Sequence, residues 1–464
     1  MEKRILLIGY NYYPEPTGIG KYNGEMMRWF MSHGYDCTVV TSYPYYPFWK
    51  VQEPYFGKRF WYSTEMAGNN TSKGKLKIIR CPQYVPSQPS GLKRILLDLS
   101  FLASSCPPLI RLMFAPKFDV IVTVAPSFQV GLLGIFFKMI RKAKLVYHIQ
   151  DMQIEAARDL KMIKSTVLIS LLFKIEKFIF NKAEIVSSIS DGMVQKIAEK
   201  AQKDVLLFPN WTDTAVFYPL ENRLEYRREF GYSDDDKIVL YSGSIGEKQG
   251  LESILHAANA LRQHKEIKFI ICGSGPYKVE LQMIAEKLKL DNVDFLPIQP
   301  FEKFNQFLNI ADLHLIIQKA SASDLVMPSK LTTMLSVGGL SLITANHGSG
   351  LYRVVKEHNI GLLAEAENQT ALNEGILQAI EGDYSHLNKN ARNYAENFLA
   401  MDKIMSNFEQ HITGIAKAGL LADNASPMPP KISIDSASKK NGGKNPKIPV
   451  ELIDPTGESS PHKN

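Results

Sequence analysis

Two glycine turns in the second half of the chain have the residue types needed to hold a phosphorylated ligand. The segments YSGSIGEKQG and CGSGP each follow an apolar run that we expect to be a strand. Glycine lets backbone N–H groups approach an anion closely, and nucleotides bind at the carboxyl ends of parallel strands. Lys248 would then place a point charge on the phosphate oxygens of a leaving group. The other candidates in these turns are Gly243, Ser244, Gly246, Gln249, Gly273 and Gly275.

A further segment, SDLVMPSKLTTML, is a candidate for the same ligand. A helix is predicted to begin near Ser329, directly after Pro328, so the free N–H groups of its first turn would face the same edge of the sheet. Asp324, Lys330 and Thr333 are its polar candidates. The alternative is that Ser329 is only an N-cap and Lys330 only a solvated cation.

The segment YHIQDMQIEAARD supplies carboxylates where a strand of the first half should end. Asp151 at a strand end could orient an acceptor hydroxyl or stabilise a cationic sugar. His148 and Glu155 flank it, but one histidine with two acids at this spacing matches no strong metal site. His148 could equally be a core histidine with its hydrogen bonds satisfied.

Another glycine turn follows the first apolar run, in YNYYPEPTGIGKYNGEM. Gly18 and Gly20 precede an amphipathic stretch that contains Tyr22, and they could bring backbone N–H groups to an anion. The pattern is neither GxGxxG nor a Walker loop. A plain tight turn explains it equally well.

Aromatic and basic residues are interleaved in YPYYPFWKVQEPYFGKRFWY, which includes Tyr46, and the segment from Leu92 to Lys117 is basic with an apolar face. Residues 1–210 hold 28 Lys and Arg against 16 Asp and Glu, a balance of +12, whereas residues 211–464 hold 26 against 31, a balance of −5. Aromatic and basic side chains of this kind could bind lipid headgroups or stack on nucleic-acid bases, or they could belong to a buried loop without a partner. The basic half favours an anionic partner without choosing which one.

The elements that must position these residues follow the pattern of parallel sheets. Short runs rich in Ile, Val and Leu alternate with amphipathic stretches, which predicts an α/β chain with two doubly wound, Rossmann-like domains. No run reaches the roughly 18 apolar residues of a spanning helix, and the four cysteines form no CxxC pair, so we expect a protein of the reducing cytoplasm. The expected parts are a first domain over 1–210, a second over 211–383, helices that pack back across both over 384–420, and a disordered tail over 421–464.

These motifs together give the chain a family resemblance. It resembles the retaining glycosyltransferases of family 4, in particular their capsule and O-antigen branch, over roughly residues 1–415. The matching stretches are YNYYPEPTGIGKYNGEM, TSYPYYPFW, CPQYVPSQPS, HIQDMQIEAA, FPNW, YSGSIGEKQGLE and MPSKLTTMLSVGG. The resemblance implies the GT-B fold, with two facing Rossmann-like domains and a C-terminal crossing helix.

The resemblance also implies an activity: transfer, with retention, of a sugar from a nucleotide-diphosphate sugar such as GDP-fucose to a lipid-diphosphate-linked saccharide. It implies no metal and no cofactor beyond that donor, with peripheral attachment to the inner face of an anionic membrane and no nucleic-acid partner. By resemblance, the catalytic residues are Asp151 and Lys248, and the donor site adds Gly18, Gly20 and Asn210 to the turn residues. The acceptor side comprises Tyr22, Tyr46, His148 and Glu155.

The sequence departs from the family pattern at two places. Ser244 stands where many members have an arginine, and Thr333 stands where the second glutamate of the family's paired element meets the ribose. The missing second glutamate leaves open a non-catalytic nucleotide-binding subunit. A sugar-nucleotide 2-epimerase also stays open, because it uses the same fold and a fold alone does not fix function.

Overall fold

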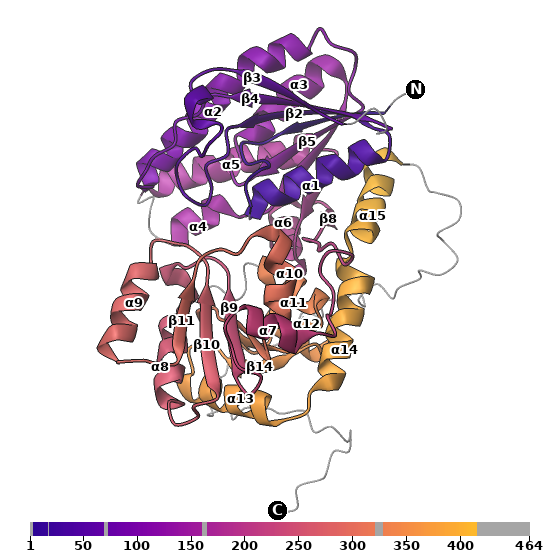
Figure 1. Cartoon of the computed structure of the whole chain (residues 1–464). Coiled ribbons are helices and arrows are strands. Elements are labelled where there is room, and N and C mark those ends of the chain that lie inside the picture. The colour runs from indigo at the N-terminus through magenta and orange to yellow at the C-terminus, as the bar shows by residue number, and fades with distance from the viewer. Residues whose placement is uncertain (1–2, 17, 69–72, 160–164, 321–327, 415–464) are drawn as a thin grey trace, which may run out of the picture.

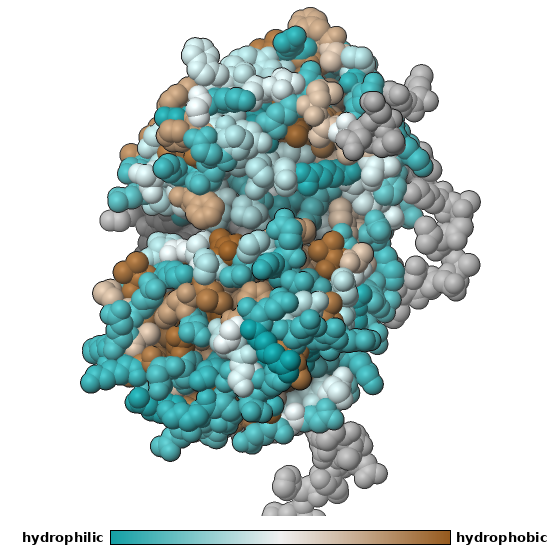
Figure 2. All heavy atoms as spheres, viewed as in Figure 1, coloured by the Kyte–Doolittle hydropathy of each residue, from teal (hydrophilic) through white to brown (hydrophobic). Residues whose placement is uncertain are grey.

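The computed structural model describes residues 3–16, 18–68, 73–159, 165–320 and 328–414, without the side chains of residues 156, 157, 159 and 248. Two α/β domains form separate lobes, the first above the second in the view of Figures 1 and 2. Each is a mainly parallel sheet with helices on both faces, as the apolar runs predict, so the expected fold class is confirmed.

The first domain is built on a sheet of eight strands in the order β3-β4-β2-β1-β5-β6-β7-β8. All neighbours are parallel except β3 and β4. The antiparallel edge strand β3 has no counterpart among the predicted runs, because its sequence STEMA is polar and half exposed. The strands are β1 (Arg4–Ile8), β2 (Asp36–Ser42), β3 (Ser63–Ala67), β4 (Lys75–Cys81), β5 (Val120–Ala125), β6 (Lys144–Ile149), β7 (Ile185–Ser188) and β8 (Val205–Leu207).

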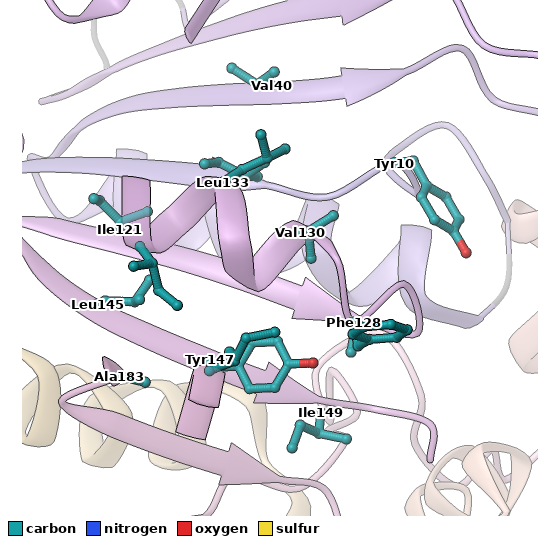
Figure 3. Close-up of a cluster of buried hydrophobic side chains, with 14 of the residues drawn as sticks. Tyr10, Val40, Ile121, Phe128, Val130, Leu133, Leu145, Tyr147, Ile149 and Ala183 are labelled. Carbon is teal, nitrogen blue, oxygen red and sulfur yellow. The ribbon is translucent and has the colours of Figure 1, made fainter. Parts of the chain in front are cut away.

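Two helix layers cover this sheet. Alternation along β1 sends Leu6 and Ile8 to one core cluster, and Ile5 and Leu7 to another. Figure 3 shows the first cluster, in which Val130 and Leu133 of α3 lie over the strands. This face carries α2 (Gly91–Leu112), α3 (Val130–Arg141), α5 (Thr166–Lys182) and α6 (Asp191–Ala201), and the opposite face carries α1 (Gly18–Ser32) and α15 (Met401–Thr413); η1 (Phe56–Lys58) and α4 (Gln153–Asp159) lie in connections.

The second domain is a parallel sheet of six strands in the order β11-β10-β9-β12-β13-β14. Its strands are β9 (Lys237–Ser242), β10 (Ile267–Cys272), β11 (Val293–Leu296), β12 (Leu313–Ile316), β13 (Ser341–Ala345) and β14 (Leu362–Glu365). One face packs against α8 (Glu252–Ala260), α9 (Lys278–Lys287) and α13 (Gln369–Glu381). The other packs against α7 (Arg223–Glu229), α10 (Phe301–Asn309), α11 (Ser329–Ser336), α12 (Gly350–His358) and α14 (Ser385–Tyr394).

The chain crosses between the domains twice, and the two crossings are hydrogen-bonded to each other. Thr212 donates its N–H to the carbonyl of Leu399 at 2.8 Å, and Met401 donates to the carbonyl of Thr212 at 3.0 Å. The second crossing follows α14 and the short π-helix η4 (Ala395–Leu399). Beyond it, α15 lies along the first domain (Figure 1), where Phe408 stacks on Phe208 with ring centroids 3.8 Å apart.

Among the described helices, α2 alone is long and apolar enough to span a membrane by length and composition. About a third of its apolar window is buried, and Leu97, Phe101 and Leu109 belong to the core of the first domain. It also contains Pro107 and Pro108. The helix therefore packs on the sheet with one side, while its other side faces outward. The expected tail, 421–464, lies outside the described residues.

Candidate active site

Two glycine turns meet at the carboxyl edge of the second sheet. Gly243 follows β9 and Gly273 follows β10, and Gly243 donates its N–H to the Cys272 carbonyl at 3.0 Å. A Cβ on Gly273 would lie 1.9 Å from the Gly243 carbonyl oxygen, and one on Gly275 would lie 1.9 Å from that of Ile245. These two positions therefore need glycine for the turns to pack against each other.

Lys330, beside these turns, has a buried amino group without a hydrogen-bond partner among the described residues. Its Nζ lies 3.8 Å from the centroid of the Tyr241 ring, and its Cδ lies 3.4 Å from where a Cβ on Gly243 would be. Burial lowers the pKa of Lys330 to about 7. A buried ammonium without an anionic partner is costly, so this position suits a bound anion.

The N-terminus of α11 lies at the same place because Lys330 is its second residue. Pro328 precedes the helix, and Ser329 is exposed. The hydroxyl of Thr333 donates to the Lys330 carbonyl at 3.0 Å, a bond within the helix. Free N–H groups of a first helical turn add to the attraction for an anion. Asp324 lies outside the described residues.

The other predicted donor residues lie on the turn after β9. Ser244 is exposed, and its carbonyl accepts a hydrogen bond from the Tyr241 hydroxyl at 2.7 Å. Gly246 precedes the short helix η2 (Glu247–Gln249). Gln249 Oε1 is buried without a partner among the described residues and lies 2.9 Å from the place of a Cβ on Gly246. Lys248 is in η2, but its side chain lies outside the described part.

A pocket of about 220 Å³ opens beside η2, towards α8 and α13. Gln249, Glu252, Lys319 and Glu365 contribute to its polar lining, and Lys330 does not line it. It lies next to the expected donor site without containing the unpaired cation.

The first glycine turn lies against a buried carboxylate. A Cβ on Gly20 would lie 2.3 Å from Glu15 Oε2, so the close approach that this glycine permits is to Glu15. Glu15 Oε1 accepts the N–H groups of Tyr45 and Tyr46 at 3.2 and 3.1 Å. Gly18 has a φ of +64° and lies next to the Tyr46 ring. Packing within the first domain explains Gly20, and a phosphate contact at either glycine stays a prediction.

Two tyrosines of the first domain contact the second domain. The Tyr46 hydroxyl lies near the side chain of Ser244. The Tyr22 hydroxyl lies near the side chain of Thr332 on α11, whose own hydroxyl donates to the Ser329 carbonyl at 2.8 Å. Both were expected on the acceptor side, and the structure brings both to the boundary between the domains.

Asp151 is exposed and follows β6, at the carboxyl edge of the first sheet. It contributes to raising the pKa of both Tyr46 and Tyr10, after the larger effect of burial, so it lies near both. The sequence motifs missed a buried carboxylate of α2: Asp98 Oδ2 accepts a hydrogen bond from Gln153, two residues after Asp151, at 3.2 Å. Burial raises the pKa of Asp98 to about 6.

Two other predicted acceptor residues are engaged inside the first domain. His148 is buried, shares a hydrogen bond with the Ser187 hydroxyl at 3.0 Å, and has a pKa lowered by burial to about 3. It is the neutral core histidine that the sequence left as an alternative. Glu155 is buried and forms an ion pair with Lys200, which also binds Glu176. An acceptor contact at Glu155 would require this pair to break.

Asn210 lies in the first crossing between the domains, half buried between Phe208 and Trp211. No group of three or more His, Cys, Asp or Glu side chains in the described part of the chain could hold a metal ion.

Family models and related proteins match almost the whole described chain. Residues 17–211 match a glycosyl transferase 4-like domain, and residues 222–398 match glycosyl transferases group 1. The chain is 37% identical over 419 residues to a protein of Escherichia coli K12 named as a colanic acid biosynthesis glycosyl transferase, WcaI, covering 89% of this chain and 100% of that one. It is 24% identical over 272 residues to the alpha-monoglucosyldiacylglycerol synthase of Streptococcus pneumoniae, covering 56% and 58% of the two chains.

Solved structures agree on the fold. Anabaena HepE in complex with UDP and glucose matches with a TM-score of 0.64 at 14% identity, covering 89% of this chain and 100% of HepE. Two facing Rossmann-like domains with a returning C-terminal helix define the GT-B class. The chain belongs to the group 1, family 4-like glycosyltransferases, as the sequence motifs indicate.

Proposed function

We propose that the protein transfers a sugar from a nucleoside-diphosphate sugar to a saccharide acceptor in the biosynthesis of a surface polysaccharide. The observation that carries this proposal is the buried, unpaired Lys330 ammonium beside the glycine turns and the N-terminus of α11. A diphosphate supplies the anion that this arrangement lacks. The name of the WcaI relative supports a polysaccharide product.

In this proposal, the donor diphosphate binds Lys330 and the free N–H groups of α11, with Lys248 beside it. These groups stabilise the charge that develops as the bond between the anomeric carbon and the phosphate oxygen breaks. Asp151 lies across the boundary and stabilises the cationic sugar or orients the acceptor hydroxyl. Retention of configuration and independence from metal are part of the proposal.

The proposal names a chemical class for the donor, a nucleoside-diphosphate sugar, and one for the acceptor, a lipid-linked saccharide. GDP-fucose follows from the sequence resemblance, whereas HepE was solved with UDP and glucose, so both bases belong in the test. A lipid-diphosphate-linked saccharide is the proposed acceptor. The name of the Streptococcus relative, a synthase of a glucosylated diacylglycerol, supports an acceptor with a lipid part.

A lipid-linked acceptor requires contact with a membrane, and the outer surface of α2, α3 and α5 is the proposed site of that contact. These helices share one layer on the first sheet. Large apolar side chains point outward from all three, at Leu92, Ile95, Leu96, Leu99 and Ile110 of α2, Phe136, Met139 and Ile140 of α3, and Val167, Leu168, Leu171 and Phe178 of α5.

The charges on the same layer have one sign. The three helices carry eight Lys and Arg residues and two acids, Asp98 and Glu176. Both acids are buried, so the exposed charges are all positive. Apolar side chains among lysine and arginine suit an anionic lipid surface, because the apolar groups can enter the acyl-chain boundary while the cationic groups stay at the anionic headgroups. The protein would then work at the cytoplasmic face of the membrane.

The donor proposal is tested by thermal shift with GDP, UDP, dTDP and CMP and their sugar conjugates, because a ligand that binds the native state raises the Tm. We expect a selective shift with one nucleoside diphosphate, lost in Lys330→Met and kept in the exposed control Lys287→Met. Sugar transfer to a lipid extract then supports a transferase. Conversion of the donor without any acceptor would favour a 2-epimerase, and binding without turnover would favour a binding subunit.

The membrane proposal is tested by sedimentation with vesicles of phosphatidylglycerol and phosphatidylcholine. We expect binding that weakens with salt and falls in Phe136→Ser/Met139→Ser. The matched control is Val279→Ser/Met283→Ser, which removes two exposed apolar side chains from α9 of the second domain. Equal binding by both double variants, or none at low salt, would remove this surface from the proposal.

A further inference from the structure

The buried carboxylate of Asp98 has no part in the transfer described above, although it is bonded to the segment that carries Asp151. Asp98 is 4% exposed and belongs to α2, where Leu97 and Phe101 pack in the core of the first domain. Its Oδ2 accepts a hydrogen bond from Gln153 Nε2 at 3.2 Å, and its Oδ1 is buried without a partner among the described residues. Gln153 is the first residue of α4, so this bond joins α2 to the start of that helix.

The segment around Gln153 is held by the core, and Asp151 is the exposed residue among positions 149–155. Ile149, at the end of β6, lies in the same core cluster as α2 (Figure 3), and Met152 and Ile154 belong to it as well. Because Gln153 is two residues after Asp151, their Cα atoms are at most about 7 Å apart. The Gln153 amide therefore lies within reach of a saccharide that is bound at Asp151.

The carboxylate decides which end of the Gln153 amide faces it. An ionised carboxylate only accepts hydrogen bonds, so the amide must present its NH₂ group to Asp98. The amide oxygen then points away from Asp98. No donor for Gln153 Oε1 lies among the described residues, and this oxygen is not buried. A fixed, accessible acceptor of this kind suits a hydroxyl group of a ligand.

A purely structural anchor would not need a charge at position 98. A buried carboxylate with one neutral partner and one unpartnered oxygen is costly, and asparagine could accept the same hydrogen bond without burying a charge. Asparagine could also donate, however, and the Gln153 amide could then bind in either orientation. The charge of Asp98 thus lowers stability but leaves the amide one orientation, a combination typical of functional sites.

We propose that Gln153 binds a hydroxyl of the acceptor saccharide through Oε1, and that Asp98 is the positioning residue that fixes the amide. This rests on the proposed function, in which Asp151 acts at the same end of the first sheet. The hydroxyl at Gln153 is one that does not react. Its contact therefore selects among acceptors and helps to orient the reacting hydroxyl, because a site built to bind a hydroxyl discriminates against a saccharide that lacks it.

The test measures sugar transfer from UDP-glucose and GDP-fucose to a lipid extract, with the amount of extract varied. Gln153→Met keeps the length of the side chain and removes the amide, so the amount of extract that gives half the maximal rate should rise about fivefold. Asp98→Asn allows both amide orientations, and we expect a rise of about twofold. In the double variant, Asp98→Asn should add nothing further, because the amide is already absent.

The matched control is Gln195→Met. It removes an exposed glutamine of the same domain that also donates to a carboxylate, that of Glu199. The amount of extract for half-maximal rate should stay native in this variant. The nucleotide thermal shift should stay native in all the variants, because the proposed donor site lies in the second domain.

The Tm separates this assignment from a structural one. Asp98→Asn removes a buried charge, so its Tm should not fall. A lower Tm and a lower maximal rate, at a native amount of extract for half-maximal rate, would make the pair structural and overturn the proposal. A native amount for Gln153→Met, while the native protein transfers sugar, would overturn this proposal alone. Absence of transfer by the native protein would overturn the proposed function, and this inference with it.

Discussion

The Glu15 carboxylate occupies the space that a side chain at Gly20 would need. A Cβ at position 20 would lie 2.3 Å from Glu15 Oε2 and 2.6 Å from Glu15 Cβ. From this place, Glu15 binds the N–H groups of Tyr45 and Tyr46, which begin the loop that contacts the second domain. One packing relationship in the first glycine turn thus sets the position of a residue at the boundary between the domains.

Gly20→Ala should therefore destabilise the first domain. The added methyl cannot fit unless Glu15 or α1 moves, and overpacking of this kind costs about 1–3 kcal/mol of unfolding free energy. The measurement is chemical denaturation followed by circular dichroism. The control is Gly57→Ala, because a Cβ there would meet nothing within 4 Å. Equal stability of the two variants would contradict the packing role.

Glu15 should also give the stability a pH dependence of known sign. Burial raises its pKa from about 4.5 to about 7, so the folded protein binds more protons than the unfolded chain between these values. The contribution to unfolding free energy is fully present below pH 4.5 and is lost as the pH rises to 7. Glu15→Gln, which can still accept both N–H groups, should lack this decline.

Glu15→Ala should lower the unfolding free energy through the loop that begins at Tyr45 and Tyr46. It leaves the N–H groups of Tyr45 and Tyr46 without their acceptor, at a cost of about 1–3 kcal/mol. Urea denaturation at pH 5, 6 and 7 separates the two variants. A parallel pH dependence in the native protein and Glu15→Gln would show that another group is responsible.

The fold could be predicted from the sequence because its strands are buried on both faces. Runs rich in Ile, Val and Leu, such as KLVYHI and KIVLYS, are typical of strands covered on both faces, and these two runs form β6 and β9. The edge strand β3 was missed because its polar residues give no such signal. An edge strand needs only one partner and little burial, so its composition is weakly constrained.

The site could be predicted only in part. The places of the glycine turns and of Lys330 in the fold could be predicted because each follows a strand or begins a helix, and strand ends share an edge, while their role as a donor site stays a prediction. The alternative for Lys330, a solvated cation, is wrong, since its Nζ is buried. The sequence did not indicate Glu15, Asp98 or the contacts of Tyr22 and Tyr46 with the second domain. These depend on which side chains face each other across separate elements, and spacing along the chain does not encode that.

Asp151→Asn should separate catalysis from binding. The change keeps the size and removes the charge, so turnover should fall about 100-fold or more while the nucleotide thermal shift remains. Asp204→Asn, an exposed change in the same domain, should alter neither. Initial rates at saturating donor provide the measurement. Full activity of Asp151→Asn would remove Asp151 from the catalytic residues.

Lys330 should take up a proton when a nucleoside diphosphate binds above neutral pH. Burial lowers its pKa to about 7, so at pH 8 the amine is mostly neutral without ligand. A bound diphosphate favours the charged form and raises the pKa, and uptake should approach about one proton per site. Titration calorimetry at pH 8 in buffers of different ionisation enthalpy measures this number. Lys330→Arg should bind without the uptake, because arginine stays protonated, whereas the same uptake in Lys330→Arg would assign the proton to another group. Native affinity should also fall as the pH rises from 7 to 9.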